Sequence, residues 1–210
     1  NIKYKILKND TESGLPFGEN YYPPYAAINF INQEKKKIKN GHFNSFQFTN
    51  NDTKKGKEIL KNMGVPLDAW YVVLHVRQGK GNELYNADPL TYIPAIKEVI
   101  SRGGYVFRMG DAKRFQNIQY KMEPLPKIKG LIDYPFTKQK SEFMDIFLAA
   151  TCRFCIGTMS GFWPVPRFFN KPVLMTNLIP AINYYMLNGN ELVLPKKIIE
   201  SETGKLYKLD

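Results

Sequence analysis

The feature that most constrains the fold is the apolar run from Tyr71 to Val76, Tyr-Val-Val-Leu-His-Val, which is rich in β-branched residues. A short continuous run of this kind is typical of a strand buried on both faces, as in parallel sheets. A glycine-containing loop follows, and Asp88-Pro89 then has the pattern of a helix start, with an N-cap and a proline in the first turn. A second strand is predicted over 105–109. Together these segments predict a βαβ unit with a right-handed crossover.

The same alternation continues further along the chain. We expect strands over 130–134, 153–157 and 172–176, and a helix capped by Ser141 between the first two. Residues 192–194 form either one more strand or a connection. Strands separated by helices predict an α/β fold with a Rossmann-like, doubly wound and mainly parallel sheet.

The alternation divides the chain into three expected parts. Residues 1–50 form a linker or the remnant of a preceding domain, with a lysine-rich run at 35–39. Residues 51–195 form the Rossmann-like domain, and residues 196–210 form a C-terminal extension. Because the first residue is Asn1 rather than methionine, we expect a fragment of a longer protein.

Charge and cysteine content restrict the partners and the compartment. Lys and Arg number 30 against 19 Asp and Glu, and the resulting net charge of +11 favours anionic partners. Two cysteines are too few for a disulfide-stapled secreted module, and no signal-peptide pattern opens the sequence, so we expect a reducing, cytoplasmic location. No apolar stretch has the ~20 residues that a membrane span needs. The basic charge would still suit peripheral contact with anionic lipid at the inner face of a membrane.

Polar residues follow the predicted strands at the edge where open α/β sheets bind ligands. His75 and Arg77 end the first strand, and Arg108, Gly110 and Asp111 end the second. Arg77 is always charged and can make forked hydrogen bonds to phosphate, although an ordinary salt-bridged arginine is the alternative. His75 is either a core histidine or part of a site. Asp111 suits ribose or base groups, or a turn.

A second candidate is the turn Gly157-Thr158-Met159-Ser160-Gly161, which links a predicted strand to a short helix. Hydroxyls, backbone N–H groups and a helix dipole together favour a bound phosphate. The turn has neither the Walker A pattern nor the G-x-G-x-x-G spacing, so an ordinary strand–helix connection is the alternative.

Cys152 and Cys155 have C-x-x-C spacing, but no second cysteine pair or nearby histidine completes a zinc site. The pair also precedes and enters a predicted strand, whereas a redox pair follows one at a helix N-terminus. We therefore expect two buried, inert thiols and no metal site.

Val73-Leu74-His75-Val76-Arg77 resembles the H-x-R motif of the fucosyltransferase superfamily, which includes protein O-fucosyltransferases, α1,6-fucosyltransferases and Nod-factor fucosyltransferases. The chain more closely resembles a bacterial glycosyltransferase family with the same motif. The resemblance covers roughly residues 50–200 through an ordered set of motifs. They are H-V-R at 75–77, N-A-D at 86–88, Y-I-P-A-I at 92–96, R-G-G-Y-V-F-R-M-G-D at 102–111, I-D-Y at 132–134, and the segment 143–161.

This resemblance implies a GT-B glycosyltransferase, with the chain as its donor-binding domain and residues 1–50 as a remnant of the acceptor domain. It implies that Arg77 contacts the β-phosphate of a nucleotide-diphosphate sugar, and that Thr158 and Ser160 contact the diphosphate. In fucosyltransferases the donor is GDP-linked fucose. Gln78-Gly79-Lys80 stands here where those enzymes have an acidic residue after H-x-R, so the sugar and the base stay open.

Transfer from such a donor builds negative charge on the leaving diphosphate, which cationic side chains and helix N-termini can stabilise. The sequence has no D-x-D pair, so we expect metal-independent transfer, with no cofactor beyond the donor substrate. Asp88 or Glu83 is the candidate general base for the hydroxyl of a glycan, lipid-linked or protein acceptor, although Asp88 also fits a helix cap. We assign His75, Arg77 and Asp88 to catalysis, and Arg108, Gly110, Asp111, Thr158, Ser160 and Gly161 to donor binding.

Two other functions stay open. One is a non-catalytic domain that binds polyanions or nucleic acid, and the other is a protein related to sugar-nucleotide epimerases. The aromatic residues fall in apolar strand and helix runs rather than among Lys and Arg, so we expect no nucleic-acid partner.

Overall fold

The structure, a computed structural model, describes residues 15–17, 20–22, 48–79, 83–112, 122–179, 191–200 and 202–206. The chain divides into two compact units, residues 1–44 with 181–189 and residues 45–180 with 190–210. In the first unit, β1 (Leu15–Phe17) and β2 (Asn20–Tyr22) form an antiparallel hairpin, which the sequence pattern does not predict. The lysine-rich run at 35–39 lies outside the described residues.

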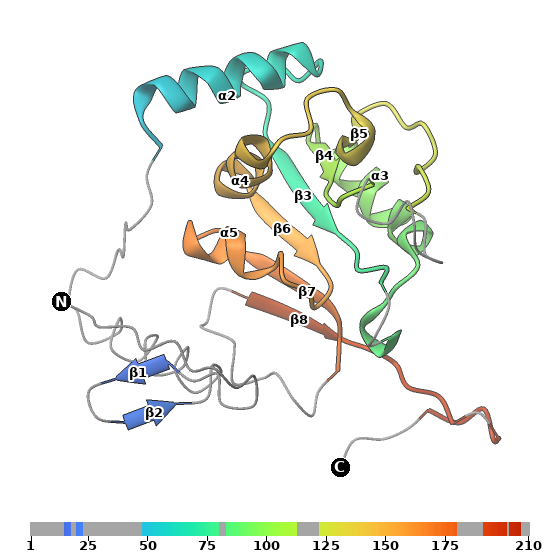
Figure 1. The fold of residues 1–210 in the computed structure, drawn as a ribbon. Coiled ribbons are helices and arrows are strands. Elements are labelled where there is room, and N and C mark those ends of the chain that lie inside the picture. The colour runs from blue at the N-terminus through green and yellow to red at the C-terminus, as the bar shows by residue number, and fades with distance from the viewer. Residues whose placement is uncertain are drawn as a thin grey trace. The chain divides into compact units, whose positions relative to one another are not determined.

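The second unit contains a six-stranded sheet in which all neighbouring strands are parallel (Figure 1). Its spatial order, β5-β4-β3-β6-β7-β8, corresponds to the order 3-2-1-4-5-6 of the Rossmann fold. This order confirms the predicted Rossmann-like sheet, and residues 191–195 are its sixth strand rather than a connection. The strands are β3 (Tyr71–His75), β4 (Tyr105–Arg108), β5 (Leu131–Asp133), β6 (Phe154–Gly157), β7 (Val173–Leu178) and β8 (Glu191–Pro195).

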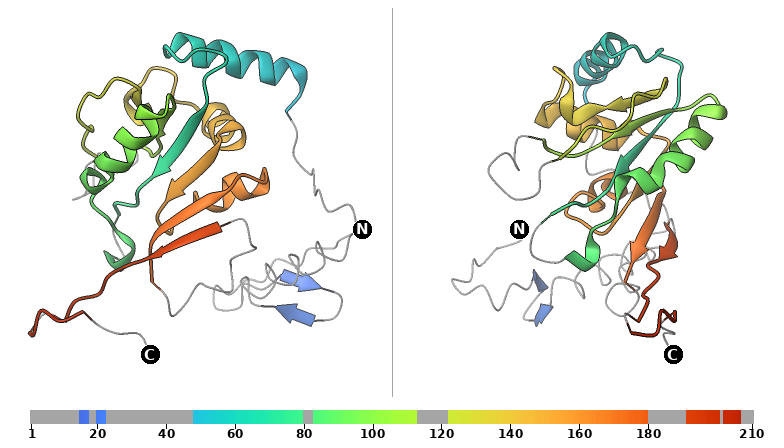
Figure 2. Two further views of the ribbon diagram at one scale, coloured as in Figure 1. Left: turned by 180° about the vertical axis from the view of Figure 1, so that it is seen from behind. Right: turned by 90° about the vertical axis from the view of Figure 1, so that its right-hand side faces the viewer.

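Helices cover both faces of this sheet, with α3 on one face and α4 and α5 on the other (Figure 2). No helix of the described segments is long and apolar enough to cross a membrane. The α-helices are α2 (Asn50–Asn62), α3 (Ile93–Ser101), α4 (Glu142–Thr151) and α5 (Pro164–Phe168). The 3-10 helices are η1 (Glu83–Tyr85), η2 (Pro89–Tyr92) and η3 (Tyr134–Phe136).

The helix starts follow local hydrogen bonding. Helix α2 begins after Thr49, because Thr49 Oγ1 accepts the Asp52 N–H at 3.1 Å while the Asp52 carboxylate accepts the Thr49 N–H at 3.2 Å. The predicted helix after Asp88 starts as the separate turn η2. Pro94 has no N–H to donate to the carbonyl of Leu90, which accepts from Ile93 instead.

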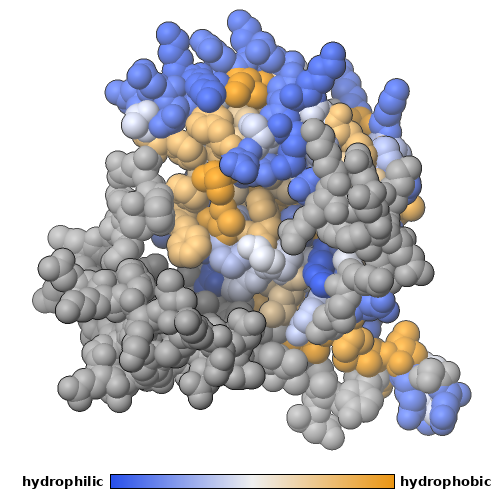
Figure 3. Space-filling model, in the orientation of Figure 1, coloured by the Kyte–Doolittle hydropathy of each residue, from blue (hydrophilic) through white to orange (hydrophobic). Residues whose placement is uncertain are grey.

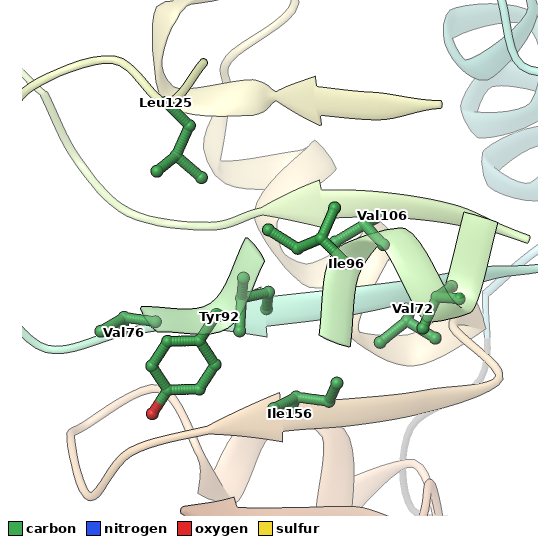
Figure 4. Packing of buried hydrophobic residues seen from close by; sticks show 9 residues of the cluster. Val72, Val76, Tyr92, Ile96, Val106, Leu125 and Ile156 are labelled. Atoms are coloured by element: carbon green, nitrogen blue, oxygen red, sulfur yellow. The ribbon is translucent and has the colours of Figure 1, made fainter. Parts of the chain in front are cut away.

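The core lies between the sheet and its helices. On the face covered by α3, side chains from β3, β4, β6 and α3 interlock and are almost fully buried (Figure 4). They include Val72, Val106, Ile156 and Ile96. Continuous burial of this kind on both faces explains why the strands carry near-continuous apolar runs.

Cys152 and Cys155 are free and fully buried, as the sequence predicts. Burial raises the pKa of the Cys152 thiol to about 12 and holds that of Cys155 well above its ordinary value. Both groups therefore stay protonated at neutral pH, and thiolates are the reactive form of cysteine.

Candidate active site

The carboxyl ends of β3 and β6 lie side by side at the centre of the sheet, with His75 in register with Gly157. From β3 the chain builds outward through β4 to β5, and from β6 it builds outward on the other side through β7 to β8. The loops that leave β3 and β6 therefore diverge. A topological switch point of this kind is where open α/β sheets bind ligands.

His75 is half-buried and contacts the turn after β6. Its Nδ1 lies 3.1 Å from Ser160 Oγ, and its ring stacks on Phe162 with the ring centres 5.0 Å apart. Ser160 Oγ also accepts the N–H of Phe162 at 3.2 Å, so the hydroxyl lies between the imidazole and the start of the next segment. Burial, assisted by the charges of Arg108 and Arg77, lowers the pKa of His75 to about 4, so the imidazole is neutral at pH 7.

Arg77 lies two residues beyond β3 and contacts two neighbouring segments. Its N–H donates to Thr158 Oγ1 at 2.8 Å, and its carbonyl accepts the N–H of Ala87 at 3.1 Å. Its guanidinium Nη1 donates to Asn86 Oδ1 at 2.9 Å. The Thr158 side chain is fully buried, so its hydroxyl supports the backbone of Arg77 inside the fold, whereas the sequence assigns it to direct contact with a diphosphate.

Arg108 also lies inside the fold, whereas the sequence assigns it to donor binding. Its side chain is 2% exposed, and Nη1 lies 3.2 Å from Asp133 Oδ1 on the neighbouring strand β5. Nη1 also donates to the carbonyl of Glu123 at 2.7 Å, and Nη2 donates to Gln78 Oε1 at 3.3 Å. A guanidinium buried this deeply needs such partners. The side chain therefore joins β4 to β5 and to the loop after β3.

Three other predicted residues lie at the same edge or in the loops that leave it. Gly110 follows β4 with a φ of +149°, a conformation that favours glycine, and Met122 lies against it. Asp111 comes next and is exposed. Asp88 is exposed and caps η2, because its carboxylate accepts the N–H of Leu90 at 2.9 Å. The helix-cap alternative for Asp88 is thus confirmed.

The turn after β6 has an open tip. Gly161 is exposed, and a Cβ added there would meet no atom within 4 Å. Helix α5 begins only at Pro164 and has 5 residues, so it supplies little of the helix dipole that the sequence predicts behind this turn. The turn therefore leaves open space beside the backbone of Gly161, next to the hydroxyl of Ser160.

Asn86 and Lys196 also support this edge of the sheet, and neither is among the residues that the sequence assigns to the site. Asn86 Oδ1 accepts from Arg77 and from the N–H of Gly79 at 3.0 Å, and Asn86 Nδ2 donates to the carbonyl of Gly79 at 2.7 Å. Lys196 Nζ donates to the carbonyls of Leu84 at 2.6 Å and Asn86 at 2.8 Å. The only sequence signal for Asn86 is its place in the N-A-D motif, and Lys196 has none.

The groups that meet at the switch point are mainly hydrogen-bond donors. Arg77 brings a guanidinium and Ser160 a hydroxyl beside the backbone of Gly161, and the imidazole of His75 contacts this hydroxyl. Donors and a positive charge suit an anion, and phosphate groups in particular. Within the described segments, no three His, Cys, Asp or Glu side chains form a group that could hold a metal ion.

The strand order and these groups define a Rossmann-like α/β domain with donor groups at its switch point. Solved structures of similar fold are glycosyltransferases. A family 9 glycosyl transferase from Veillonella parvula DSM 2008 superposes with a TM-score of 0.50 and 12% identity, over 71% of this chain and 42% of that chain. The ADP-heptose LPS heptosyltransferase II of E. coli gives a TM-score of 0.51 and 13% identity, over 75% of this chain and 46% of that chain.

These similarities establish a shared fold, that of a Rossmann-like domain of GT-B glycosyltransferases. The chain spans less than half the length of either protein. No protein-family model matches the sequence, and no curated protein matches it. Neither of the two similar structures is a fucosyltransferase, so they give no support to the fucosyl specificity that the H-x-R resemblance implies.

Proposed function

We propose that this chain is the donor-binding part of a glycosyltransferase that uses a nucleotide-diphosphate sugar. The observation that carries the proposal is the hydrogen bond of the Arg77 backbone to Thr158, which sets Arg77 next to the turn 157–161 at the switch point of a Rossmann sheet. The glycosyltransferase fold of the two similar structures supports it. The donor diphosphate would lie across the ends of β3 and β6.

In the reaction, the bond between the anomeric carbon and the β-phosphate oxygen breaks, and a bond to an acceptor hydroxyl oxygen forms. The leaving diphosphate gains negative charge, which the Arg77 guanidinium and the donors of Ser160 and Gly161 would stabilise. Neutral His75 would hold the Ser160 hydroxyl in place. The acceptor, a glycan, lipid-linked or protein hydroxyl, gives its proton to a base, for which exposed Asp88 and Glu83 are the candidates.

Calorimetric titration with ADP, GDP, UDP and CDP tests the diphosphate site directly. We expect one of the four to bind, and Arg77→Ala to weaken that binding by about 1.5–3 kcal/mol, the value of a hydrogen bond to a charged group. Arg77→Lys should recover only part, because an ammonium lacks the forked geometry. Arg102→Ala is the matched control, since it removes an equal charge from an exposed pair with Glu98. Failure of all four nucleotides to bind would refute the proposal.

Product analysis separates transfer from the epimerase alternative. With the matching nucleotide sugar, a transferase releases the nucleoside diphosphate, whereas an epimerase returns an intact nucleotide sugar with one inverted centre. The absence of a D-x-D pair supports metal-independent transfer. Activity should therefore survive excess EDTA, and a loss that Mn²⁺ or Mg²⁺ restores would contradict this part of the proposal.

We also propose that the basic face of α2 contacts anionic lipid. Lys54, Lys57 and Lys61 line a hollow of about 440 Å³ together with Glu58 and with Leu67, which is 59% exposed. Hydrophilic side chains dominate this end of the molecule (Figure 3). Vesicles containing phosphatidylglycerol should sediment the protein, and pure phosphatidylcholine vesicles should not. Replacing all three lysines by glutamine should abolish the difference, and an unchanged difference would refute the assignment of α2.

A further inference from the structure

The side chain of Asn86 links Arg77 and Gly79, which follow β3, to the described residues before Ala87. The Asn86 carboxamide oxygen accepts from Arg77 Nη1 at 2.9 Å and from the N–H of Gly79 at 3.0 Å, and its amide donates to the carbonyl of Gly79 at 2.7 Å. The N–H of Ala87 bonds back to the carbonyl of Arg77. One half-buried carboxamide therefore fixes both the loop backbone and one nitrogen of the guanidinium.

The chemistry of this support differs from that of two other arginines in the fold. Arg108 lies 3.2 Å from the carboxylate of Asp133, and Arg167 lies 2.5 Å from that of Glu191. The contact of Asn86 with Arg77, by contrast, is made by an amide oxygen, which orients the guanidinium and brings no negative charge to it. A carboxylate at the same position would attract the guanidinium more strongly and repel an incoming diphosphate.

Lys196 anchors the same loop at its far end. It follows β8, and its Nζ donates to the carbonyls of Leu84 and Asn86, while its own N–H donates to the carbonyl of Leu178 in β7. Strands β6 and β7 lie between β3 and β8 (Figure 1), so Lys196 joins residues 84 and 86 to a strand three places away from β3. Arg77 is thus supported through a loop fixed at both sides of the switch point.

We infer that Asn86 is a positioning residue for Arg77 whose neutrality is required for binding a diphosphate, and that Lys196 holds Asn86 in place. This inference rests on the proposed function. It extends that function by adding Asn86, which lies outside the H-x-R motif, to the residues on which the affinity for the diphosphate depends.

The test compares Asn86→Ala with Asn86→Asp in calorimetric titrations with the nucleoside diphosphate that the parent protein binds. Asn86→Ala should raise Kd about tenfold, because the guanidinium loses its fixed orientation. Asn86→Asp keeps the acceptor for Arg77 and for the Gly79 N–H but loses the bond from the Asn86 amide to the Gly79 carbonyl. It should therefore melt between Asn86→Ala and the parent, yet bind at least as weakly as Asn86→Ala. It should also show a smaller dependence of log Kd on salt concentration.

A purely structural role for Asn86 predicts the opposite ranking. In that case Asn86→Asp would recover nucleotide binding together with thermal stability, and this result would overturn the inference, as would parent-like binding by Asn86→Ala. Asn50→Asp is the matched control, because it adds the same charge at an exposed position of α2. Lys196→Met should also raise Kd, as Asn86→Ala does, and an unchanged Kd would show that Lys196 does not support Asn86.

If Arg77→Ala weakens binding and both Asn86 variants do not, the inference fails and the proposed function stands. If the parent binds no nucleotide, both fail.

Discussion

Removing the charge of Asp133 should expose the cost of leaving the Arg108 guanidinium buried without its counter-charge. Breaking one partner out of a buried ion pair costs about 3–5 kcal/mol of unfolding free energy. Here the carboxylate is 18% exposed, and Arg108 would keep its bonds to Glu123 and Gln78. We therefore expect Asp133→Asn to cost near the lower limit, about 3 kcal/mol.

Urea unfolding followed by far-UV circular dichroism measures this cost through the shift in midpoint at constant slope. The matched control is Glu98→Gln, which breaks an exposed pair with Arg102 and should cost less than about 0.5 kcal/mol. Combining Asp133→Leu with Arg108→Met removes both charges and should recover part of the loss. If Asp133→Asn costs no more than Glu98→Gln, then Arg108 is not held as a buried cation, and its assignment to the interior is refuted.

Three further predictions follow from the packing and titration of particular side chains. The folded pKa of His75 lies near 4 and its unfolded pKa near 6.5, so its contribution should lower the unfolding free energy by about 3 kcal/mol as pH falls from 6.5 to 4. His75→Gln should lose this part of the pH dependence in urea titrations, and an unchanged profile would contradict the assignment. Gly56→Ala should destabilise α2 by about 1–3 kcal/mol despite its better helix propensity, because a Cβ there would overlap the Phe147 ring. A stabilised variant in the same assay would argue against this packing. Ser160→Ala should weaken nucleotide binding by about 1 kcal/mol. Gly161→Val should weaken binding more without lowering Tm, because its added Cβ meets no protein atom. If both variants have the Kd of the parent in calorimetric titration, the turn is only a connection between strand and helix.

Much of the sheet could be predicted because strands buried on both faces produce continuous apolar runs that end at glycine. The hairpin of β1 and β2 could not, since strands of 3 residues are too short to show alternation. The inner face of helix α4 could not be predicted: Ile146 is 41% exposed, whereas Met144 and Leu148 are fully buried. The helix is apolar nearly all round, so its periodicity does not select one stripe.

The candidate site could be predicted only as far as the strand ends. His75 and Arg77 follow directly from the end of β3, but the sequence does not give the strand order that brings β6 beside it. The partners of Arg108 could not be predicted for the same reason. Asp133 lies 25 positions further along the chain and becomes a neighbour only because β5 pairs with β4. The support that Asn86 gives to Arg77 could not be predicted, because an asparagine in a loop has no characteristic spacing from the residue that it contacts.

The parallel order of the sheet also has a consequence for how the chain folds. The central pair, β3 with β6, joins residues about 80 positions apart, such as Val72 and Phe154. Contacts of such sequence separation form only after the entropy of closing a long loop has been overcome, which makes them slow. The contact of His75 with Ser160 spans 85 positions, so it forms only when the two halves of the sheet have joined. During synthesis, the edge with its donor groups would therefore be completed only after β6 has left the ribosome, and nucleotide binding would report on the finished sheet rather than on its first half.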